Sequence, residues 1–274
     1  MKRVHEERIE LLSSITEEKR SHVLLYGANI GQNTALLSWE KAARAMTPTW
    51  YPLERPALEL SFRNSSFQDH EERYWVIEQE NLRRQFALVV KQRLAHGSVQ
   101  HLSIFGIAPQ PLLMELGRLL SDISTAEVYQ LHREPPDWRW QEHPTDFTYH
   151  LDEPADRKQN VAINLSLSAH IDNARIHQVL GEDVSIWTVH VSEPGNDFLK
   201  SRQQLSMFRQ FFRYLLDRIK MEHGEAATLH IFPAVPVAVA IEMGRVWMSK
   251  ADLAMHIFDQ NRAAGGFVEC LTLI

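Results

Sequence analysis

The chain of 274 residues contains a single cysteine, which excludes an internal disulfide and any metal site built from several cysteines. This residue, Cys270, lies in the apolar segment FVECLTLI, where we expect an inert buried thiol rather than a nucleophile. Basic residues are also too few for a broad nucleic-acid surface, because 29 Lys and Arg stand against 35 Asp and Glu. The formal charge of −6 argues against wrapping duplex DNA, although a pocket can still be locally positive.

Long hydrophobic runs and the standard nucleotide-binding sequences are missing as well. No run approaches the length that spans a bilayer and no secretory leader opens the chain, so we expect a cytoplasmic protein without a membrane partner. Neither G-x-G-x-x-G nor a Walker-type loop occurs. The 14 histidines have no spacing typical of metal ligands, and no residue pair looks like a nucleophile with its base. These absences favour a binding protein over an enzyme.

What the sequence does contain is a regular alternation of strands and helices. Strands are predicted at residues 22–31, 55–62, 99–109, 126–133, 147–151, 161–168, 184–191, 227–232, 254–260 and 267–274. Helices are predicted at residues 70–96, 110–120, 170–181, 197–224 and 237–248. Such alternation indicates the α/β class with largely parallel sheets, and its two rounds indicate two halves.

The two halves carry an internal repeat at an offset of 127 residues. Without a gap, the offset aligns Ile104-Phe105 with Ile231-Phe232, Pro109 with Pro236, Glu115 with Glu242, and Gly117-Arg118 with Gly244-Arg245. Both copies read as a strand, a proline-bearing turn, an apolar helix with Glu-x-Gly-Arg, and a further strand. We interpret this as a duplication, against the alternative of two unrelated units that share a generic apolar pattern.

The prolines at the two strand-to-helix junctions suggest a ligand site. Proline is tolerated in the first helical turn, where amides lack partners within the helix, and those amides then face the carboxyl edge of the sheet. Open α/β sheets bind ligands at that edge. Two such turns facing each other would form one composite pocket for a ligand with several phosphates, although each proline could merely end its strand. The candidate residues in the turns are Ala108, Pro109, Gln110, Pro233, Ala234 and Pro236.

Further candidates follow the strand that opens each half. Asn29 and Gln32 lie in or next to the loop GANIG, which is either a weak phosphate loop or a plain turn. Ser166 and Ser168 end the corresponding strand of the second half, and Ser168 could instead cap the next helix.

The region between the halves is rich in proline, aromatic and charged residues. Trp138 could stack on a base or belong to the core, while Arg133 and Lys200 could neutralise phosphate. The nearby EPADRK, with Asp156 and Lys158, faintly resembles a metal-dependent nuclease fragment, but its proline-rich surroundings favour a linker.

The segment TLHIFPAVPVAVAIEMGRVWMSKADLAMHIFDQN (residues 228–261) resembles the signature of SAVED domains, the sensor domains of bacterial anti-phage CBASS effectors. The resemblance covers residues from about 22 to 274. It implies two fused CARF-like, Rossmann-like units, here residues 21–155 and 156–274. It also implies a cyclic oligonucleotide messenger bound across both units of a bacterial cytoplasmic protein, with assembly into homo-oligomers.

Other segments resemble one subgroup of this family. MKRVHEERIELL looks like the helix that follows an HNH nuclease domain, so residues 1–20 are expected to be a linker helix, and NSSFQDHEERYW and YQLHREPPDWRWQE look like the same subgroup. The resemblance implies a parent DNA endonuclease activated by a cyclic dinucleotide of the cGAMP type. Catalysis, divalent metal and DNA contacts would then belong to that nuclease domain, because its histidines and asparagine are absent here. The alternatives are an enzyme that cleaves its cyclic nucleotide and a self-associating scaffold.

Overall fold

The structure is a computed structural model that describes residues 19–30, 37–53, 56–62, 67–96, 100–121, 123 and 125–274. The expected linker helix therefore lies almost entirely outside the described residues, and Gln32 lies outside them as well. Among the described residues, no helix is long and apolar enough to cross a membrane.

The first unit is built on a parallel sheet with the order β2-β1-β4-β5, in which β3 also pairs with β1. Its strands are β1 (Arg20–Ala28), β2 (Tyr51–Pro52), β3 (Leu58–Phe62), β4 (Leu102–Ile107) and β5 (Ala126–Val128). Its helices are α2 (Trp39–Met46), α3 (Glu72–Phe86), the π-helical turn η2 (Ala87–Lys91), α4 (Gln92–Ala95) and α5 (Gln110–Leu119). Because β1 and β4 are buried on both faces, they read as continuous apolar runs rather than as alternating ones.

The second unit is built on a six-stranded sheet with the order β11-β10-β9-β7-β8-β6, parallel at its centre and antiparallel at both edges. Its strands are β6 (His150–Asp152), β7 (Asn160–Ser166), β8 (Ser185–His190), β9 (Thr228–Ala234), β10 (Met255–Asn261) and β11 (Gly266–Leu273). Its helices are α6 (Asn173–Leu180), α7 (Arg202–His223) and α8 (Val237–Val246). The boundary predicted at residue 155 assigns β6 to the first unit. In the structure, β6 is hydrogen-bonded to β8 of the second unit.

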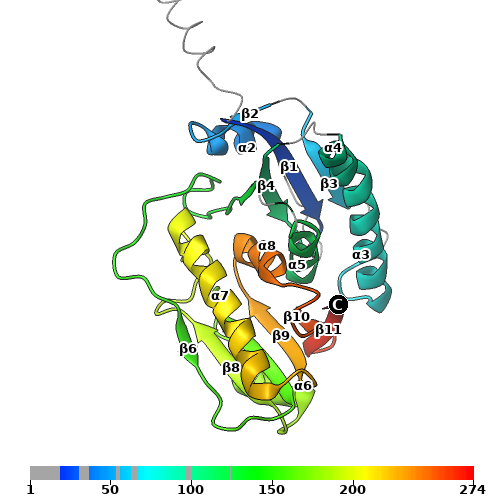
Figure 1. The fold of residues 1–274 in the computed structure, drawn as a ribbon, viewed down its shortest axis with the longest axis vertical. Coiled ribbons are helices and arrows are strands. Elements are labelled where there is room, and N and C mark those ends of the chain that lie inside the picture. Colours follow the sequence, from blue (N-terminus) through cyan, green and yellow to red (C-terminus); the bar gives the residue numbers. More distant parts are fainter. Residues whose placement is uncertain are drawn as a thin grey trace, which may run out of the picture.

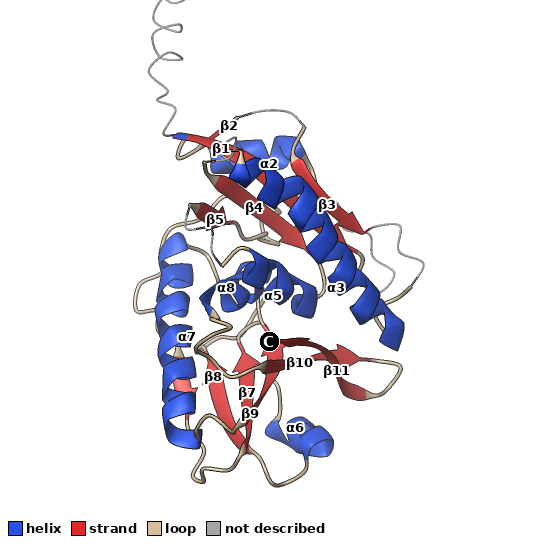
Figure 2. Cartoon of the chain, turned by 45° about the vertical axis from the view of Figure 1, so that its right-hand side comes forward, coloured by secondary structure: helices blue, strands red, loops and turns tan. Residues whose placement is uncertain are grey.

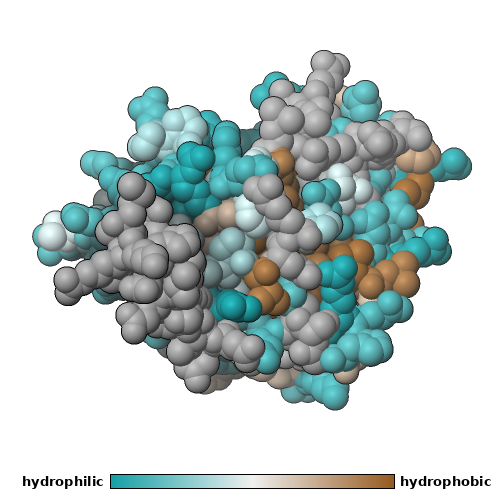
Figure 3. Space-filling view, turned by 90° about the horizontal axis from the view of Figure 1, so that it is seen from above, coloured by the Kyte–Doolittle hydropathy of each residue, from teal (hydrophilic) through white to brown (hydrophobic). Residues whose placement is uncertain are grey.

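Helices α5 and α8 lie side by side between the two sheets, with α3 and α7 flanking them (Figures 1 and 2). One continuous hydrophobic core joins both units through this layer, because it contains Leu24 and Ile104 of the first sheet together with Ile163 and Ile231 of the second. The units therefore share one core. Seen from above, the surface is mostly hydrophilic, with small patches of hydrophobic side chains (Figure 3).

The repeat predicted from the sequence is present in the fold. Helix α5 begins after Pro109 and α8 after Pro236, and both helices span the same number of residues at the offset of 127. The first helical hydrogen bonds also correspond, from Leu113 N to Pro109 O at 3.1 Å and from Ala240 N to Pro236 O at 3.0 Å. The prediction of two α/β units with largely parallel sheets is thus confirmed.

The two repeated glycines let α5 and α8 approach each other closely. A Cβ atom on Gly117 would lie 1.9 Å from the carbonyl oxygen of Ile241, and one on Gly244 would lie 1.9 Å from that of Met114. These contacts are equivalent under the offset. The glycine of each Glu-x-Gly-Arg is therefore required by packing between the units.

Candidate functional site

The two proline turns come together at the seam between the units. Pro109 and Pro236 are the N-cap residues of α5 and α8, and neither helix has a side-chain cap at its first turn. The backbone N–H of Val235 donates to Oε1 of Gln110 at 3.4 Å, which links the second turn to the first residue of α5. The structure therefore places the ends of β4 and β9 and the starts of both helices next to each other.

Gln130 is a residue of this seam that the sequence analysis missed. It is 4% exposed, and its Oε1 accepts a hydrogen bond from the N–H of Ala238, in the first turn of α8, at 3.1 Å. Its Nε2 donates to the carbonyl of Leu131 at 2.8 Å. An amide at the positive end of α8 is thus paired with a side chain of the first unit. The only signal in the sequence was a glutamine near the end of the strand predicted at residues 126–133. In the structure, this strand ends at Val128.

Ser166 and Ser168, at the end of β7, have different environments. Ser166 is buried, and its hydroxyl donates to Asn164 Oδ1 and accepts from Ile171 N, both at 2.9 Å, so it stabilises the turn that follows β7. The hydroxyl of Ser168 is buried without a partner among the described residues, while its N–H donates to the carbonyl of Ala234 at 2.6 Å. Helix α6 is capped by Asp172, so the capping alternative for Ser168 was wrong.

The remaining turn residues also lie at the carboxyl ends of strands. Ala108 and Pro233 are buried, and Pro233 pairs with Leu165 of β7 in the sheet register. Asn29 directly follows β1, and its carbonyl accepts a hydrogen bond from the Tyr74 hydroxyl at 3.4 Å.

The aromatic candidate, Trp138, has no ring face available for stacking on a ligand, because it is buried. Trp138 is 3% exposed and packs edge-on against Phe105, with 5.3 Å between the ring centroids, which matches the core alternative. Arg133 and Lys200 are exposed on two neighbouring loops. Those loops are joined because Arg133 N donates to Asp197 Oδ1 at 2.9 Å, and Gln141 N donates to the carbonyl of Lys200 at 2.8 Å.

The structure also shows the environments of Cys270 and of the EPADRK loop. Burial raises the pKa of the Cys270 thiol, which therefore stays protonated and unreactive. The EPADRK loop lies at the surface before β7, where Lys158 Nζ donates to the carbonyl of Glu182 at 2.7 Å and Arg157 pairs with Glu222. The described residues contain no cluster of three or more histidine, cysteine or carboxylate side chains that could hold a metal.

A depression of about 690 Å³ lies between the units at the end of β1. Its walls come from the loop before α3 and from the β10–β11 hairpin, and they carry Asp69 of the first unit and Asp259 of the second. Burial, together with the nearby Asp69 carboxylate, raises the pKa of Asp259 to about 6, although the Gln260 N–H partly opposes this. Like charges from the two units therefore approach each other here at neutral pH.

This raised pKa predicts a pH-dependent stability for Asp259. Between pH 6 and 4 the native chain binds a proton that the unfolded chain does not, so the free energy of unfolding rises as the pH falls through this window. Relative to Asp259→Asn, the wild type should gain about 2 kcal/mol between pH 7 and pH 4. Urea unfolding of both proteins at each pH measures the difference; parallel pH profiles would show that Asp259 is not perturbed.

Comparisons with known proteins place the chain in a family. The family model described as "SMODS-associated and fused to various effectors sensor domain", or SAVED, matches residues 82–273. The chain is similar to an Acinetobacter baumannii Cap4 SAVED/CARF-domain containing receptor with the cyclic trinucleotide 2'3'3'-cAAA, at 13% identity and a TM-score of 0.56, over 92% of this chain and 51% of that one. The same receptor with 3'3'3'-cAAA matches at 13% identity and 0.53, over 96% and 55%.

A Moraxella osloensis Cap4 SAVED/CARF-domain containing receptor matches at 13% identity and a TM-score of 0.50, over 96% of this chain and 52% of that one. The chain thus spans about half the length of these receptors. No curated protein matches it. At this identity the likeness concerns the fold, and it agrees with the two α/β units found here. Because the family model covers well over half of its residues, this chain belongs to the SAVED family of sensor domains.

Proposed function

We propose that the chain senses a cyclic oligonucleotide, which it binds at the seam where the two proline turns meet. The observation that carries this proposal is the hydrogen bond between Gln110 and Val235, because it joins the starts of α5 and α8 at one place. A cyclic oligonucleotide repeats its phosphodiester groups around a ring. The seam presents two helix N-termini to such a ligand, each with a positive dipole end, and the Val235 and Ala238 N–H groups there are bonded only to glutamine side chains that a phosphate can displace.

A ligand at the seam can also replace hydrogen bonds that the chain now makes with itself. Gln110 and Gln130 each accept one backbone N–H near the start of α8, and both carry amide groups able to bond to base edges or phosphates. A phosphate that takes the Ala238 N–H would release Gln130 from it. The Ser168 hydroxyl, buried without a partner among the described residues, is a further donor at the same edge. Asn29 and Ala234 complete the proposed site, and Gln32, Arg133 and Lys200 remain sequence-based candidates.

Family membership supports a sensor rather than a catalyst, and the similar Acinetobacter baumannii Cap4 receptor was solved with two different cyclic trinucleotides. The identities of the messenger and of the effector domain rest on sequence resemblance alone. On that basis we propose a cyclic dinucleotide of the cGAMP type as the messenger and an HNH DNA endonuclease as the effector. The segment that carries the linker resemblance, MKRVHEERIELL (residues 1–12), lies outside the described residues.

The proposed output is assembly of the sensor into homo-oligomers. A ligand changes an assembly equilibrium only if it binds the two states with different affinity. A messenger that contacts both units would favour the relative position of the units that fits its ring. That change would reach the outer faces through the α5–α8 layer, which is shared by both units. Nuclease domains attached to the assembled sensors would then be brought together on DNA.

Calorimetric titration with a panel of cyclic di-, tri- and tetranucleotides tests this proposal, with light scattering on the same samples. We expect one member to bind and to raise the molar mass, and chromatography should recover it intact. Gln110→Ala should weaken that binding about 10-fold or more, because the link between the turns is lost. Gln159→Ala, an exposed glutamine at the opposite end of the second sheet, serves as the control and should bind normally.

Other outcomes separate the alternatives. Recovery of a cleaved, linear nucleotide would identify an enzyme that degrades its messenger. Mass that rises with protein concentration but not with any nucleotide would identify a scaffold. If every member of the panel fails to bind, the sensor proposal is wrong for this fragment.

A further inference from the structure

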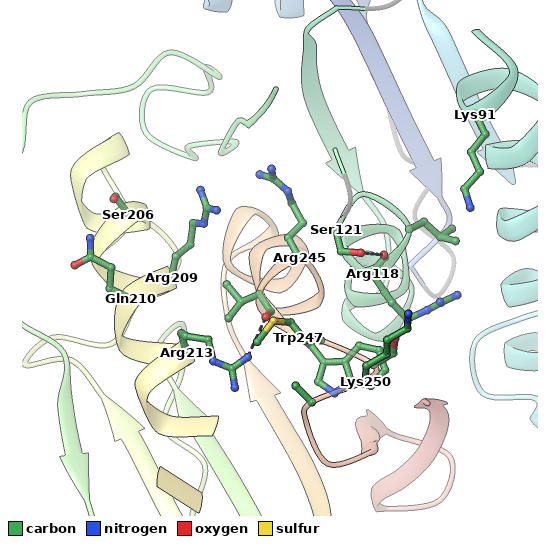
Figure 4. A pocket seen from close by; sticks show the side chains of 15 residues that line it. Lys91, Arg118, Ser121, Ser206, Arg209, Gln210, Arg213, Arg245, Trp247 and Lys250 are labelled. Carbon is green, nitrogen blue, oxygen red and sulfur yellow. Dashed lines mark hydrogen bonds between the residues drawn. The ribbon is translucent and has the colours of Figure 1, made fainter. Parts of the chain in front are cut away.

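A second pocket, of about 1000 Å³, lies at the other ends of α5 and α8, away from the proline turns. Figure 4 shows side chains reaching it from α7 on one side, from α5 and η2 on the other, and from the end of α8 between them. Its lining contains no Asp or Glu among the described residues. It contains six cationic side chains: Lys91, Arg118, Arg209, Arg213, Arg245 and Lys250.

The carboxylates that balance these cations lie behind them, out of the pocket. Glu115, 0% exposed, pairs with Arg118 at 2.5 Å and is shared with Arg83 at 2.7 Å. Its repeat equivalent Glu242, 3% exposed, pairs with Arg245 at 2.7 Å and with Arg209 at 3.2 Å. The buried carboxylates therefore hold the guanidinium groups in place while the pocket itself remains positive.

Two of the six cations, Arg245 and Arg213, are each held by several bonds within the fold. Arg245, whose side chain is 5% exposed, also donates to the carbonyls of Ile123 and Ala126 of the first unit. Arg213 donates to Asp252, Asp217 and the carbonyl of Val246. These two arginines are structural, and they leave the recognition of a ligand to the other four.

The other four cations have N–H groups to spare. Arg209 is half exposed and pairs with Glu242 through Nε, and Arg118 uses Nε and one Nη on Glu115. Lys91 and Lys250 have no carboxylate partner among the described residues. Lys91 and Arg118 belong to the first unit, and Arg209 and Lys250 to the second. A ligand held by all four would therefore tie the two units together.

Neutralising the helix ends does not account for this much charge. The carboxyl ends of α5 and α8 supply about half a negative charge each, and cations commonly offset them. Among the described residues, the six lining cations and Arg83 face four carboxylates, namely Glu115, Glu242, Asp217 and Asp252. Cationic charge remains in excess after the helix ends are counted. A bound polyanion would offset this excess of positive charge in the pocket.

We propose that this basic pocket is a second site, which binds the polyphosphate group of a linear nucleotide such as a nucleoside di- or triphosphate. Arginine and lysine donors converging from both units suit adjacent phosphates, and guanidinium groups bind them in bidentate fashion. The volume matches a compact nucleotide. An extended duplex is disfavoured by the concave shape and by the net charge of −6. The proposal does not depend on what binds at the proline turns.

Titration with sodium pyrophosphate at physiological salt tests this site in the whole chain. We expect one molecule per chain to bind, and the double variant Arg209→Ala/Lys250→Ala to weaken binding at least about 10-fold. The control is Arg44→Ala/Arg139→Ala, which removes two exposed positive charges elsewhere and should leave the affinity unchanged. Thermal unfolding without pyrophosphate checks that both variants fold.

Three results would overturn the proposal. The first is absence of binding to a folded wild type, and the second is equal affinity in the pocket variant and the control. The third is tighter binding of a single-stranded oligonucleotide at the same phosphate concentration, lost in the pocket variant, because the pocket would then be a nucleic-acid site. Any cyclic nucleotide that binds the chain should leave the pyrophosphate affinity unchanged, since competition would place both ligands in one pocket.

Discussion

Replacing Gly244 with alanine should destabilise the protein by about 3 kcal/mol or more, although alanine is the better helix former. The new Cβ would lie 1.9 Å from the carbonyl oxygen of Met114, and this contact is with backbone rather than with a flexible side chain. The gain in helix propensity is only about 1 kcal/mol. Forced overpacking of a core usually costs about 1–3 kcal/mol, and more when the neighbour cannot move. The helices α5 and α8 must therefore separate.

Urea unfolding measures this loss, and Gly117→Ala should behave in the same way because its Cβ would lie 1.9 Å from the carbonyl of Ile241. The matched control is Gly266→Ala, at the start of β11, where a Cβ would meet nothing within 4 Å. Its effect should stay within about 0.5 kcal/mol. A stable Gly244→Ala would mean that α5 and α8 are not in close contact in solution. Helices α5 and α8 would then not form a shared layer between the units.

Replacing Glu242 with alanine should cost about 3–5 kcal/mol, because it leaves a buried positive charge without its partner. Glu242 is 3% exposed, and Arg245, with a side chain 5% exposed, pairs with it at 2.7 Å. Arg245 then reaches the carbonyls of Ile123 and Ala126, so the loss extends to the contact between the units. A surface ion pair of similar composition contributes only about 0–1 kcal/mol, because water screens it.

The control for this prediction is Arg139→Ala, since Arg139 is 55% exposed and pairs with Asp137 at 3.3 Å. Its loss should change the free energy of unfolding by less than about 1 kcal/mol. Glu242→Gln keeps the shape and removes the charge, so an intermediate loss would separate electrostatics from packing. If Glu242→Ala unfolds at the same urea concentration as the wild type, the buried network does not hold the units together.

The sequence alone determined the elements that build the two sheets, because their signals are local. Short apolar runs between turn residues, such as those of β1 and β7, indicate strands buried on both faces, and the apolar face repeated along α7 indicates a helix packed on a core. It missed two short elements of the first unit, the eight-residue helix α2 and the two-residue strand β2. The repeat was visible because duplication leaves matching residue types at a constant offset.

Only the tertiary structure decided which chemical groups meet. The spacing of Glu115, Gly117 and Arg118 shows that they repeat, but not that their glycines pack across the seam or that their glutamates are shared with Arg83 and Arg209. Gln130 lies far from Ala238 in sequence, and the six cations of the basic pocket come from four segments. Such sites depend on how α3, α5, α7 and α8 pack around one core. Local patterns fix each element, whereas long-range packing fixes the distances between their side chains.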